Sequence, residues 1–310
     1  MKLSIVATLY QSAACVREFH ARIAAAAGKI TPDFEIVLVN DGSPDNSLDL
    51  AVEIHRSDPR VKVIDLARNF GHHKAMMTGL AHAGGDLVFL IDSDLEEEPE
   101  LLNEFYDRYR KGDCDVVYGV QAQRKGGWVE RVSGNFFYWV LDRLTDLDMP
   151  RNIVTARLMS RRYVRSLTEY QEREVFLAGL WHITGYAQVP VTVAKKSKGG
   201  TTYDLRRKLS ILVNSITSFS NRPLRAIFYT GTTISAVSAC YIAYLVWIWI
   251  FYSIPVDGWA SLIVSIWFIG GLIILFLGII GIYLSKMFVE IKRRPYTTIR
   301  HLYARTDERA

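Results

Sequence analysis

Apolar and polar positions alternate in short blocks over the first 100 residues, and the blocks predict strands and helices in turn. Four short apolar runs, each ending in polar or glycine-rich residues, are predicted strands: Leu3–Leu9, Glu35–Val39, Val61–Leu66 and Leu87–Ile91. Helical patterns separate them, at Ala14–Ala27, Ser47–Arg56 and His73–Ala83. Strands that alternate with helices at this spacing predict βαβ units, and hence an α/β fold with a mostly parallel sheet.

The pattern changes after residue 225, where two long uncharged stretches follow one another. Ala226–Tyr252 contains 27 residues and Ser261–Leu284 contains 24. Each exceeds the ~20 residues that a helix needs to cross the hydrocarbon core of a bilayer. The connection between them holds Pro255, Asp257 and Gly258, which are typical of a turn. Residues 226–284 are therefore predicted to form two transmembrane helices, because the core helices of a soluble protein rarely run this far without a charge.

Basic residues flank this apolar block on both sides, and the loop within it has no Lys or Arg. Those before the block are Arg206, Arg207, Lys208, Arg222 and Arg225, and those after it are Lys286, Lys292, Arg293, Arg294 and Arg300. The positive-inside rule then places both termini and the large domain in the cytoplasm, at the inner (plasma) membrane. The predicted organisation is a catalytic domain at 1–204, a juxtamembrane helix at 205–225, the two spans at 226–284 and a basic cytoplasmic tail at 285–310.

Composition sharpens this picture in three respects. The formal charge of +5 is modest and gathers beside the apolar block, which favours a membrane surface as partner over nucleic acid. Cys15, Cys114 and Cys240 lie far apart, so neither disulfides nor a zinc site is predicted.

Between Leu205 and Phe219 apolar residues recur at steps of four and three, which predicts a helix. That helix could lie in the membrane interface or pack on the catalytic domain, and both alternatives stay open.

Carboxylates follow two of the predicted strands at the point where each strand ends. Asp41 comes after the second strand, and Asp92 and Asp94 come after the fourth. Ligands of parallel sheets bind beyond these carboxyl ends. Asp41 can accept hydrogen bonds from a base or ribose, and two carboxylates one residue apart can share Mg²⁺ or Mn²⁺ and present it to a diphosphate. Taken alone, neither group is specific, because the Asp41 segment is also typical of a turn with a helix cap and the Asp92–Asp94 pair of an acidic helix start.

The combination of motifs is far more specific than any one of them. Four motifs occur in order, each at its own strand end: Asn40-Asp41-Gly42-Ser43, Arg68-Asn69-Phe70-Gly71, Gly85-Asp86 and Asp92-Ser93-Asp94-Leu95. Their order and spacing resemble family 2 glycosyltransferases, which carry a GT-A-type nucleotide-diphosphosugar domain. More narrowly, Leu66–Gly71 followed by Ala75 and Gly79, the segment Arg157–Arg162 and two C-terminal apolar helices are similar to the polyisoprenyl-phosphate (dolichyl- or undecaprenyl-phosphate) branch. The resemblance covers essentially the whole chain.

The resemblance implies a role for each matched residue. Thr8, Tyr10 and Asp41 would line the nucleotide pocket, and Asp92 would contact ribose or phosphate. Asp94, together with Asp92, would hold the metal, Mg²⁺ or Mn²⁺. The cations implied at the acceptor phosphate or the donor diphosphate are Arg157, Lys195, Lys196 and Lys198. Among all of these, the implied catalytic residues are Asp92, Asp94 and Arg157.

The chain departs from the branch at two places. Glu96 stands where the acidic motif usually has glutamine, and its carboxylate could bind the metal or face solvent. Asn152 and Thr155 stand where aspartates are common, and neither can act as a carboxylate base. A phosphate acceptor has less need of a base, because its oxygen is already anionic near neutral pH. A sugar hydroxyl would need a carboxylate from elsewhere, with Glu172 or Glu174 nearest in sequence.

The main hypothesis is an inverting, metal-dependent transfer from a nucleotide sugar, with UDP as the expected nucleotide, to a polyprenyl phosphate at the cytoplasmic membrane face. One alternative is extension of a lipid-linked saccharide for surface polysaccharide. Another is a non-catalytic membrane scaffold, which the presence of Asp41, Asp92 and Asp94 argues against. Processive synthesis is disfavoured, because the chain contains no Arg-Trp dipeptide. Neither the sugar nor self-association into a homo-oligomer follows from the sequence.

Overall fold

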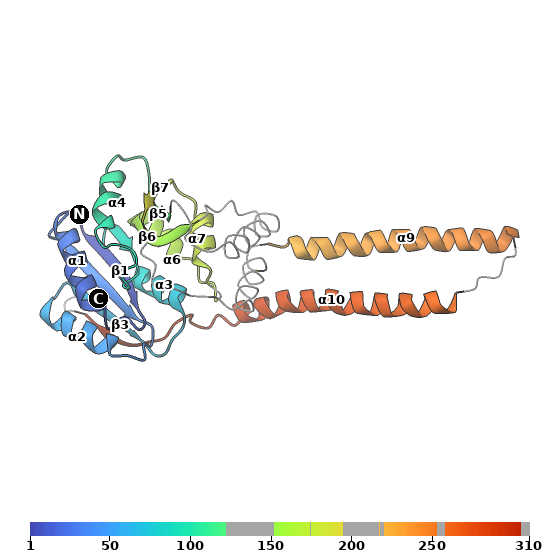
Figure 1. The fold of residues 1–310 in the computed structure, drawn as a ribbon, viewed down its shortest axis with the longest axis horizontal. Helices are drawn as coiled ribbons and strands as arrows, with labels where there is room; N and C mark the ends of the chain where they lie inside the picture. Colours follow the sequence, from blue (N-terminus) through green and yellow to red (C-terminus); the bar gives the residue numbers. More distant parts are fainter. Residues whose placement is uncertain (122–151, 174, 195–216, 218–219, 253–257, 305–310) are drawn as a thin grey trace. The chain divides into compact units, whose positions relative to one another are not determined.

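The computed structural model describes residues 1–121, 152–173, 175–194, 217, 220–252 and 258–304, which form two units. The first unit is built around a sheet that has eight strands within the described residues, in the order β7-β5-β6-β4-β1-β2-β3-β8. The strands are β1 (Leu3–Leu9), β2 (Phe34–Asn40), β3 (Val61–Leu66), β4 (Leu87–Leu90), β5 (Val116–Gln121), β6 (Ile153–Ser160), β7 (Gln188–Val193) and β8 (Ile299–Tyr303). The predicted α/β fold with a mostly parallel sheet is confirmed (Figure 1).

Four strands at the centre of the sheet, β1 to β4, are parallel to one another, whereas β6 and β8 run against their neighbours. All residues of β1 and β2 are buried, because helices cover both faces of the sheet. A strand that is buried on both faces has apolar residues at successive positions. The sequence pattern therefore predicted the bounds of these strands closely.

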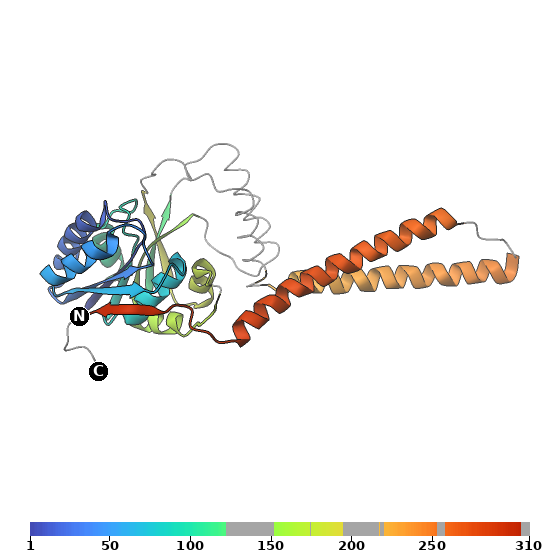
Figure 2. The same cartoon turned by 90° about the horizontal axis from the view of Figure 1, so that it is seen from below.

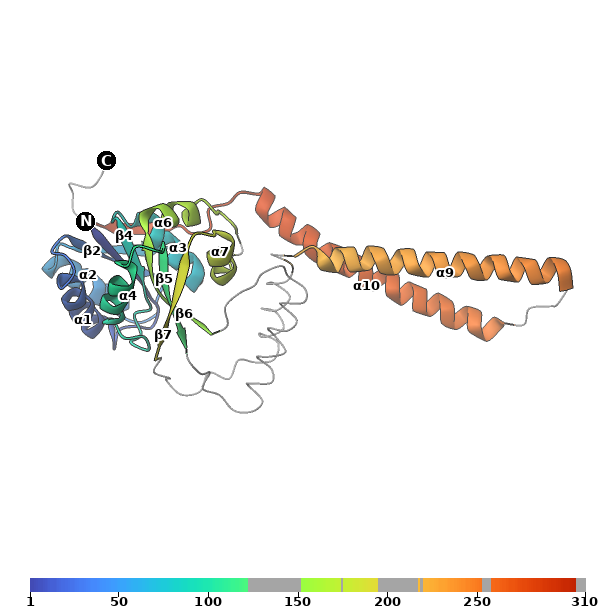
Figure 3. The same cartoon turned by 90° about the horizontal axis from the view of Figure 1, so that it is seen from above.

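Helices cover the two faces of the sheet in separate layers, and each layer has its own core (Figure 3). The first layer holds α1 (Val16–Gly28), α2 (Ser47–Ser57) and α4 (Leu101–Tyr109). The second layer holds α3 (His72–His82), α6 (Arg161–Thr168) and α7 (Leu177–Ile183). Gly79 brings α3 close to the sheet, since a Cβ there would lie 2.5 Å from Val6 Cγ1 and 2.9 Å from Val39 Cγ2. This close approach places the first residues of α3 above the ends of β1 and β4.

The last strand, β8, belongs to the same sheet although it follows the apolar helices in sequence. Ile64 of β3 pairs with Leu302 of β8 in the antiparallel sense, and Thr78 of α3 contacts Thr297 through their hydroxyls at 2.9 Å. Figure 2 shows β8 along the edge of the sheet, beside β3. The sequence assigned residues 285–310 to a basic tail, but the described part of this segment, 285–304, contains the end of α10 and a strand of the central sheet. The pattern missed β8 because this short edge strand carries Arg300 and His301 among its apolar residues.

The second unit contains two long helices, α9 (Arg222–Tyr252) and α10 (Trp259–Ile291), which contact each other. Within the described residues, the segment Ser265–Ile291 is long and apolar enough to cross a membrane, with a mean hydropathy of 2.5. Most of its large side chains are exposed, among them Trp267 and Ile274, which expose more than two thirds of their surface. The predicted amphipathic segment before α9 lies largely outside the described residues.

Glu35 of β2 links three strands at the amino end of the sheet. Its Oε1 accepts hydrogen bonds from Ser4 Oγ (2.5 Å) and from the backbone N–H of Gly84 (2.6 Å). Its Oε2 lies 2.9 Å from the ammonium of Lys62 and 3.2 Å from that of Lys2. Burial would raise the pKa of Glu35, but Ser4, Gly84 and Lys62 outweigh it and lower that pKa to about 2. The carboxylate is therefore a charged group buried with its partners in place.

We expect Glu35→Gln to lower the free energy of unfolding by about 3 kcal/mol, because the change removes the charge that two lysines share. The stabilisation should be complete above the ordinary pKa of 4.5 and should decline as the pH falls towards 2, where the native carboxylate becomes protonated. Chemical denaturation of the detergent-solubilised chain, repeated between pH 3 and pH 7, measures both effects. Glu53→Gln is the matched control, since Glu53 forms an exposed ion pair with Arg17 worth under about 1 kcal/mol. Equal losses in the two variants would contradict this account.

Candidate active site

Four loops meet at the carboxyl ends of β1 to β4. Ser93 links two of them, because its buried hydroxyl donates to the carbonyl oxygen of Thr8 (2.7 Å) and contacts Ser12 Oγ at 3.1 Å. Gly42, in the loop after β2, brings that loop against the loop after β3, with a φ of +60° and no room for a side chain. A Cβ there would lie 2.4 Å from the backbone nitrogen of Asn69. The motifs that stand apart in the sequence are therefore neighbours at one edge of the sheet.

Asp92 is held from two sides. His72, the first residue of α3, places Nε2 3.1 Å from Asp92 Oδ1 and Nδ1 3.0 Å from Thr8 Oγ1. On the other side, Thr155 of β6 donates its hydroxyl to Asp92 Oδ2 at 2.8 Å. Burial lowers the pKa of His72, but the hydrogen bond and the charge of Asp92 outweigh it, so the pKa lies above its ordinary value. The pairing with the carboxylate of Asp92 thus favours the protonated form of this imidazole.

Buried Glu97 holds the segment of β6 that carries Thr155. Its carboxylate accepts the backbone N–H groups of Thr155 (3.1 Å) and Ala156 (2.7 Å). These two bonds connect the loop after β4 with the start of β6. The orientation of Asp92 thus depends on β1, α3 and β6 together, and the side chains that set it are Thr8, His72 and Thr155.

Asp94 is the carboxylate of this loop that is suited to an external ligand. It is half-buried, and its Oδ1 accepts the backbone N–H of Glu96 at 2.9 Å, across Leu95 with a φ of +61°. Within the described residues, no group of three or more His, Cys, Asp or Glu side chains is placed to hold a metal ion. The carboxylate oxygens of Asp94 and Asp92 suit Mg²⁺ or Mn²⁺ chemically, provided that a bound substrate supplies further oxygen ligands.

Asp41 is buried and its carboxylate supports a loop. Both oxygens accept backbone N–H groups, from Phe70 at 2.7 Å and from Gly71 at 3.0 Å. Burial raises the pKa of Asp41, although both N–H groups favour the charged form. Tyr10, which was predicted to line the same nucleotide pocket, differs from the buried Asp41 because 48% of it is exposed, just beyond the end of β1. The structure thus supplies a structural role for Asp41, and its predicted contact with a nucleotide stays a prediction.

Arg157 of β6 is fully buried in the second helical layer. Its guanidinium lies over the ring of Trp181, 3.0 Å from the ring centroid, and Nε donates a long bond of 3.4 Å to the carbonyl oxygen of Thr155. Within the described part of the chain no carboxylate pairs with it, and the charge of Glu97 acts from a greater distance. Burial lowers the pKa of Arg157 to about 9, so the side chain remains a cation at neutral pH.

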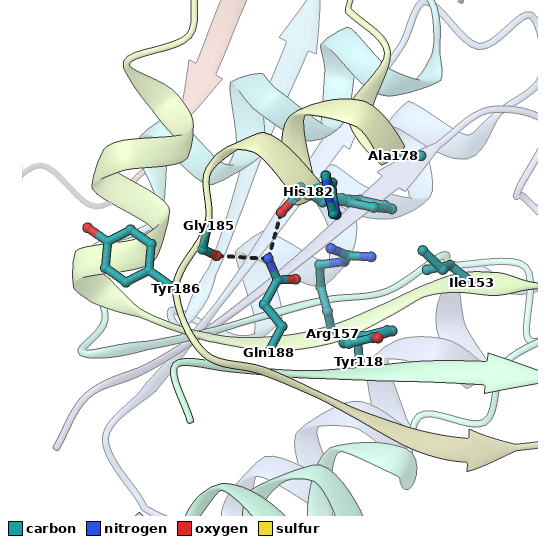
Figure 4. Close-up of a pocket in the computed structure, with 9 residues that line it drawn as sticks. Tyr118, Ile153, Arg157, Ala178, His182, Gly185, Tyr186 and Gln188 are labelled. Atoms are coloured by element: carbon teal, nitrogen blue, oxygen red, sulfur yellow. Dashed lines mark hydrogen bonds between the residues drawn. The ribbon is translucent and has the colours of Figure 1, made fainter. Parts of the chain in front are cut away.

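This cation lines a pocket of about 330 Å³ between β5, β6 and α7 (Figure 4). Trp181 also lines it, with a buried indole N–H that has no hydrogen-bond partner among the described residues. Gln188 closes one side by donating to the carbonyl oxygens of Trp181 (2.7 Å) and Gly185 (2.9 Å). A buried cation and an unpaired donor in one pocket are suited to an anionic ligand.

Lys195, Lys196, Lys198 and Glu174 lie outside the described residues. Asn152 and Thr155 are described, and Thr155 contacts Asp92 as given above.

Comparison with known proteins agrees with this geometry. Residues 4–168 match the model of glycosyl transferase family 2. The chain belongs to glycosyltransferase family 2. A Mycobacterium tuberculosis protein described as a glycosyltransferase is 54% identical over 98% of this chain and 89% of its own length. A bactoprenol glucosyl transferase of Shigella flexneri, derived from prophage SfII, is 30% identical over 95% of this chain and 96% of its own.

A solved structure supports the fold of this glycosyltransferase. Glucosyl-3-phosphoglycerate synthase from Mycobacterium tuberculosis superposes with a TM-score of 0.50, at 17% identity, over 70% of this chain and 79% of the other. The predicted family is confirmed, and the bactoprenol glucosyl transferases among its relatives support the polyisoprenyl-phosphate branch. Sequence reasoning missed His72, Glu97 and Trp181. His72 directly follows the motif Arg68-Asn69-Phe70-Gly71, and that position was the one feature of the sequence that could have identified it as a site residue.

We expect His72→Asn to lower the rate of glycosyl transfer by roughly tenfold to a hundredfold, because Asn cannot reach both Thr8 and Asp92. Melting temperature should change little, since the imidazole is part of the site and not of the two cores. Initial rates of the purified enzyme, measured beside its melting curve, test this expectation. His82→Asn is the matched control, at the other end of α3, where the exposed imidazole contacts Thr78. A normal rate in His72→Asn would show that Asp92 keeps its orientation without the imidazole.

Proposed function

We propose that this glycosyltransferase transfers a sugar from a UDP-sugar to a polyprenyl phosphate, with inversion, at the cytoplasmic face of the plasma membrane. The observation that carries the proposal is the buried cation of Arg157, which pairs with no carboxylate among the described residues and is linked through Thr155 to Asp92. An anion-binding pocket beside a loop suited to metal and diphosphate is what this transfer requires. The names of the bactoprenol glucosyl transferases among the relatives point to the same class of acceptor.

In this mechanism each group has a separate task. Asp94 and Asp92 would hold Mg²⁺ or Mn²⁺, which when bound offsets negative charge on the diphosphate. Thr8 and His72 keep Asp92 in place, and Tyr10 and Asp41 lie at the strand ends assigned to the nucleotide. Only the family resemblance supports a role in binding a diphosphate or lipid phosphate for Lys195, Lys196 and Lys198.

Arg157 would bind the lipid phosphate and orient one of its oxygens towards the anomeric carbon. That oxygen supplies the electron pair for the new bond, while the bond from the anomeric carbon to the diphosphate breaks and UDP leaves with its electron pair. The attacking oxygen carries no proton near neutral pH, so the step requires no general base. This accounts for Asn152 and Thr155 at positions where carboxylates are common in the branch.

The position of β8 supports a membrane hairpin whose two ends lie on the same side of the membrane. The chain leaves the catalytic unit before α9 and re-enters its sheet at β8. A chain that starts and ends on one side must cross the membrane an even number of times. If Ser265–Ile291 spans the bilayer, α9 therefore spans it as well, and the large exposed apolar side chains of α10 meet lipid.

The proposal is tested with the full chain in lipid nanodiscs that contain undecaprenyl phosphate. We expect a single sugar to be transferred from a UDP-sugar with inversion, and we expect chelation or Asp94→Asn to abolish transfer. Undecaprenyl-diphosphate-linked saccharide is the competing acceptor, and a preference for it would favour chain extension instead. No lipid-linked product from any common UDP-sugar would overturn the proposal.

We expect Arg157→Gln to raise the KM for lipid phosphate by roughly tenfold to a hundredfold, because a charge-assisted bond to phosphate is worth about 1.5–3 kcal/mol. The KM for the UDP-sugar should stay near its normal value. Arg157→Lys should recover only part of the loss, since an ammonium cannot bind phosphate through two parallel bonds. Arg165→Gln, which removes an exposed arginine of α6, is the control. An unchanged KM for lipid phosphate in Arg157→Gln would place the acceptor elsewhere.

A further inference from the structure

The C-terminal chain that enters β8 contacts the loop that follows β3. Ala67, the first residue of that loop, donates its backbone N–H to the carbonyl oxygen of Thr298 at 2.9 Å. Its own carbonyl oxygen accepts a hydrogen bond from Arg300 Nη2 at 2.5 Å. Both backbone groups of Ala67 are thus bound to the C-terminal chain. The motif Arg68-Asn69-Phe70-Gly71 follows directly and ends where α3 begins.

Arg300 reaches a second acceptor because the register of β8 shifts at this point. Asp65 of β3 pairs with His301. Leu66, the next residue, pairs with Ile299, so Arg300 is the extra residue of a bulge. In a regular strand the neighbour of His301 would point to the face opposite Asp65. The bulge permits Arg300 to turn back, and its Nη1 lies 3.5 Å from Asp65 Oδ2.

Asp65 connects Arg300 to the loop after β2. The side chain of Asp65 is only 3% exposed, and its Oδ1 accepts a hydrogen bond from Asn40 Nδ2 at 2.8 Å. The amide oxygen of Asn40 accepts the backbone N–H of Ser43 at 3.2 Å. One orientation of this amide satisfies both contacts, because the carboxylate needs a donor and the N–H group needs an acceptor. Arg300 is therefore linked, through one buried carboxylate and one buried amide, to the turn of the motif Asn40-Asp41-Gly42-Ser43.

The two loops that Arg300 supports are also bonded to each other. Asp41, in the loop after β2, accepts the backbone N–H groups of Phe70 and Gly71, in the loop after β3. A displacement of either loop would therefore break bonds to the other. Arg300 belongs to neither loop, and its side chain is 60% exposed. Its effect on the site must pass through the groups that it contacts.

We propose that Arg300 is a positioning residue for the donor nucleotide, and that it acts through Asp65 and Ala67 on the two loops at the carboxyl ends of β2 and β3. The role rests on the proposed function, which places the nucleotide of a UDP-sugar at Asp41. Without the guanidinium the loops would also sample arrangements that do not bind the nucleotide. The apparent Kd is the intrinsic Kd divided by the fraction of molecules in the binding arrangement, so a smaller fraction weakens binding.

The test measures the Kd for UDP by calorimetry, with the full chain in nanodiscs and Mn²⁺ present. We expect Arg300→Gln to raise this Kd roughly threefold to tenfold, the range for one lost hydrogen bond. The KM for lipid phosphate should stay near its normal value. Arg300→Lys should recover part of the loss, because an ammonium keeps a charge beside Asp65 but lacks the planar donors that also reach Ala67. Hydrogen exchange should be faster in residues 40–46 and 67–72 of Arg300→Gln.

Two variants of the same C-terminal segment separate positioning from a general loss of stability. Arg294→Gln removes the same charge from an exposed position. Thr297→Val removes the hydroxyl contact with Thr78, which also attaches this segment to the first unit. Both variants should keep the normal Kd for UDP, and a rise in either as large as that in Arg300→Gln would overturn the proposal. Arg300→Gln should weaken binding less in an Asp65→Asn chain than in the unaltered chain, and full additivity would contradict the route through Asp65.

The same measurements distinguish failure of this role from failure of the proposed function. A chain that binds UDP equally well with and without Arg300→Gln would overturn the positioning role alone. A chain that binds no UDP in its unaltered form would overturn the proposed donor, and the role of Arg300 with it.

Discussion

In the register of the central strands, Thr8 of β1 lies opposite Val39 of β2, and Val6 lies opposite Leu90 of β4. This parallel pairing brings the ends of three strands to one edge, and the polar loops that follow them have no other place to meet. Gly79 then allows α3 to approach β1 and β2, which carries His72 to the same edge. The site therefore depends on backbone pairing and on one close helix contact before any of its side chains can interact.

The antiparallel strand β6 contributes Arg157 and Thr155 beside the parallel strands that lead to the carboxylates. Leu90 pairs with Arg157, so the pocket of Arg157 and the loop of Asp92 lie on adjacent strands. Thr155, two residues from Arg157, points to the same face of the sheet and contacts Asp92. That hydroxyl links the region assigned to the donor with the region assigned to the acceptor, in addition to the pairing of β4 with β6, and Glu97 holds the linking segment through two backbone N–H groups.

The sequence predicted the parallel part of the fold closely, because buried strands are apolar throughout and their ends are polar. Leu3–Leu9 and Val61–Leu66 have the same bounds in pattern and structure. Motifs predicted Asp92, Asp94 and Arg157 as site residues, and that role stays a prediction, whereas the side chains around them could not be predicted. Contacts such as His72 with Asp92 or Trp181 with Arg157 join residues distant in sequence, and no local periodicity encodes them. β8 was missed for the same reason: its pairing with β3 depends on a strand more than 200 residues earlier, and its own pattern is weak.

The place of β8 in the sheet also bears on how the protein is made. Synthesis runs from the N-terminus, so β3 emerges early and β8 emerges after both long helices. Until then the outer edge of β3 has unpaired backbone groups, which in other proteins invite pairing with foreign strands. The catalytic domain can complete its sheet only once the apolar helices have been produced. A chain that ended before α9 would keep that edge open permanently, and we would expect it to aggregate more readily than the full-length enzyme.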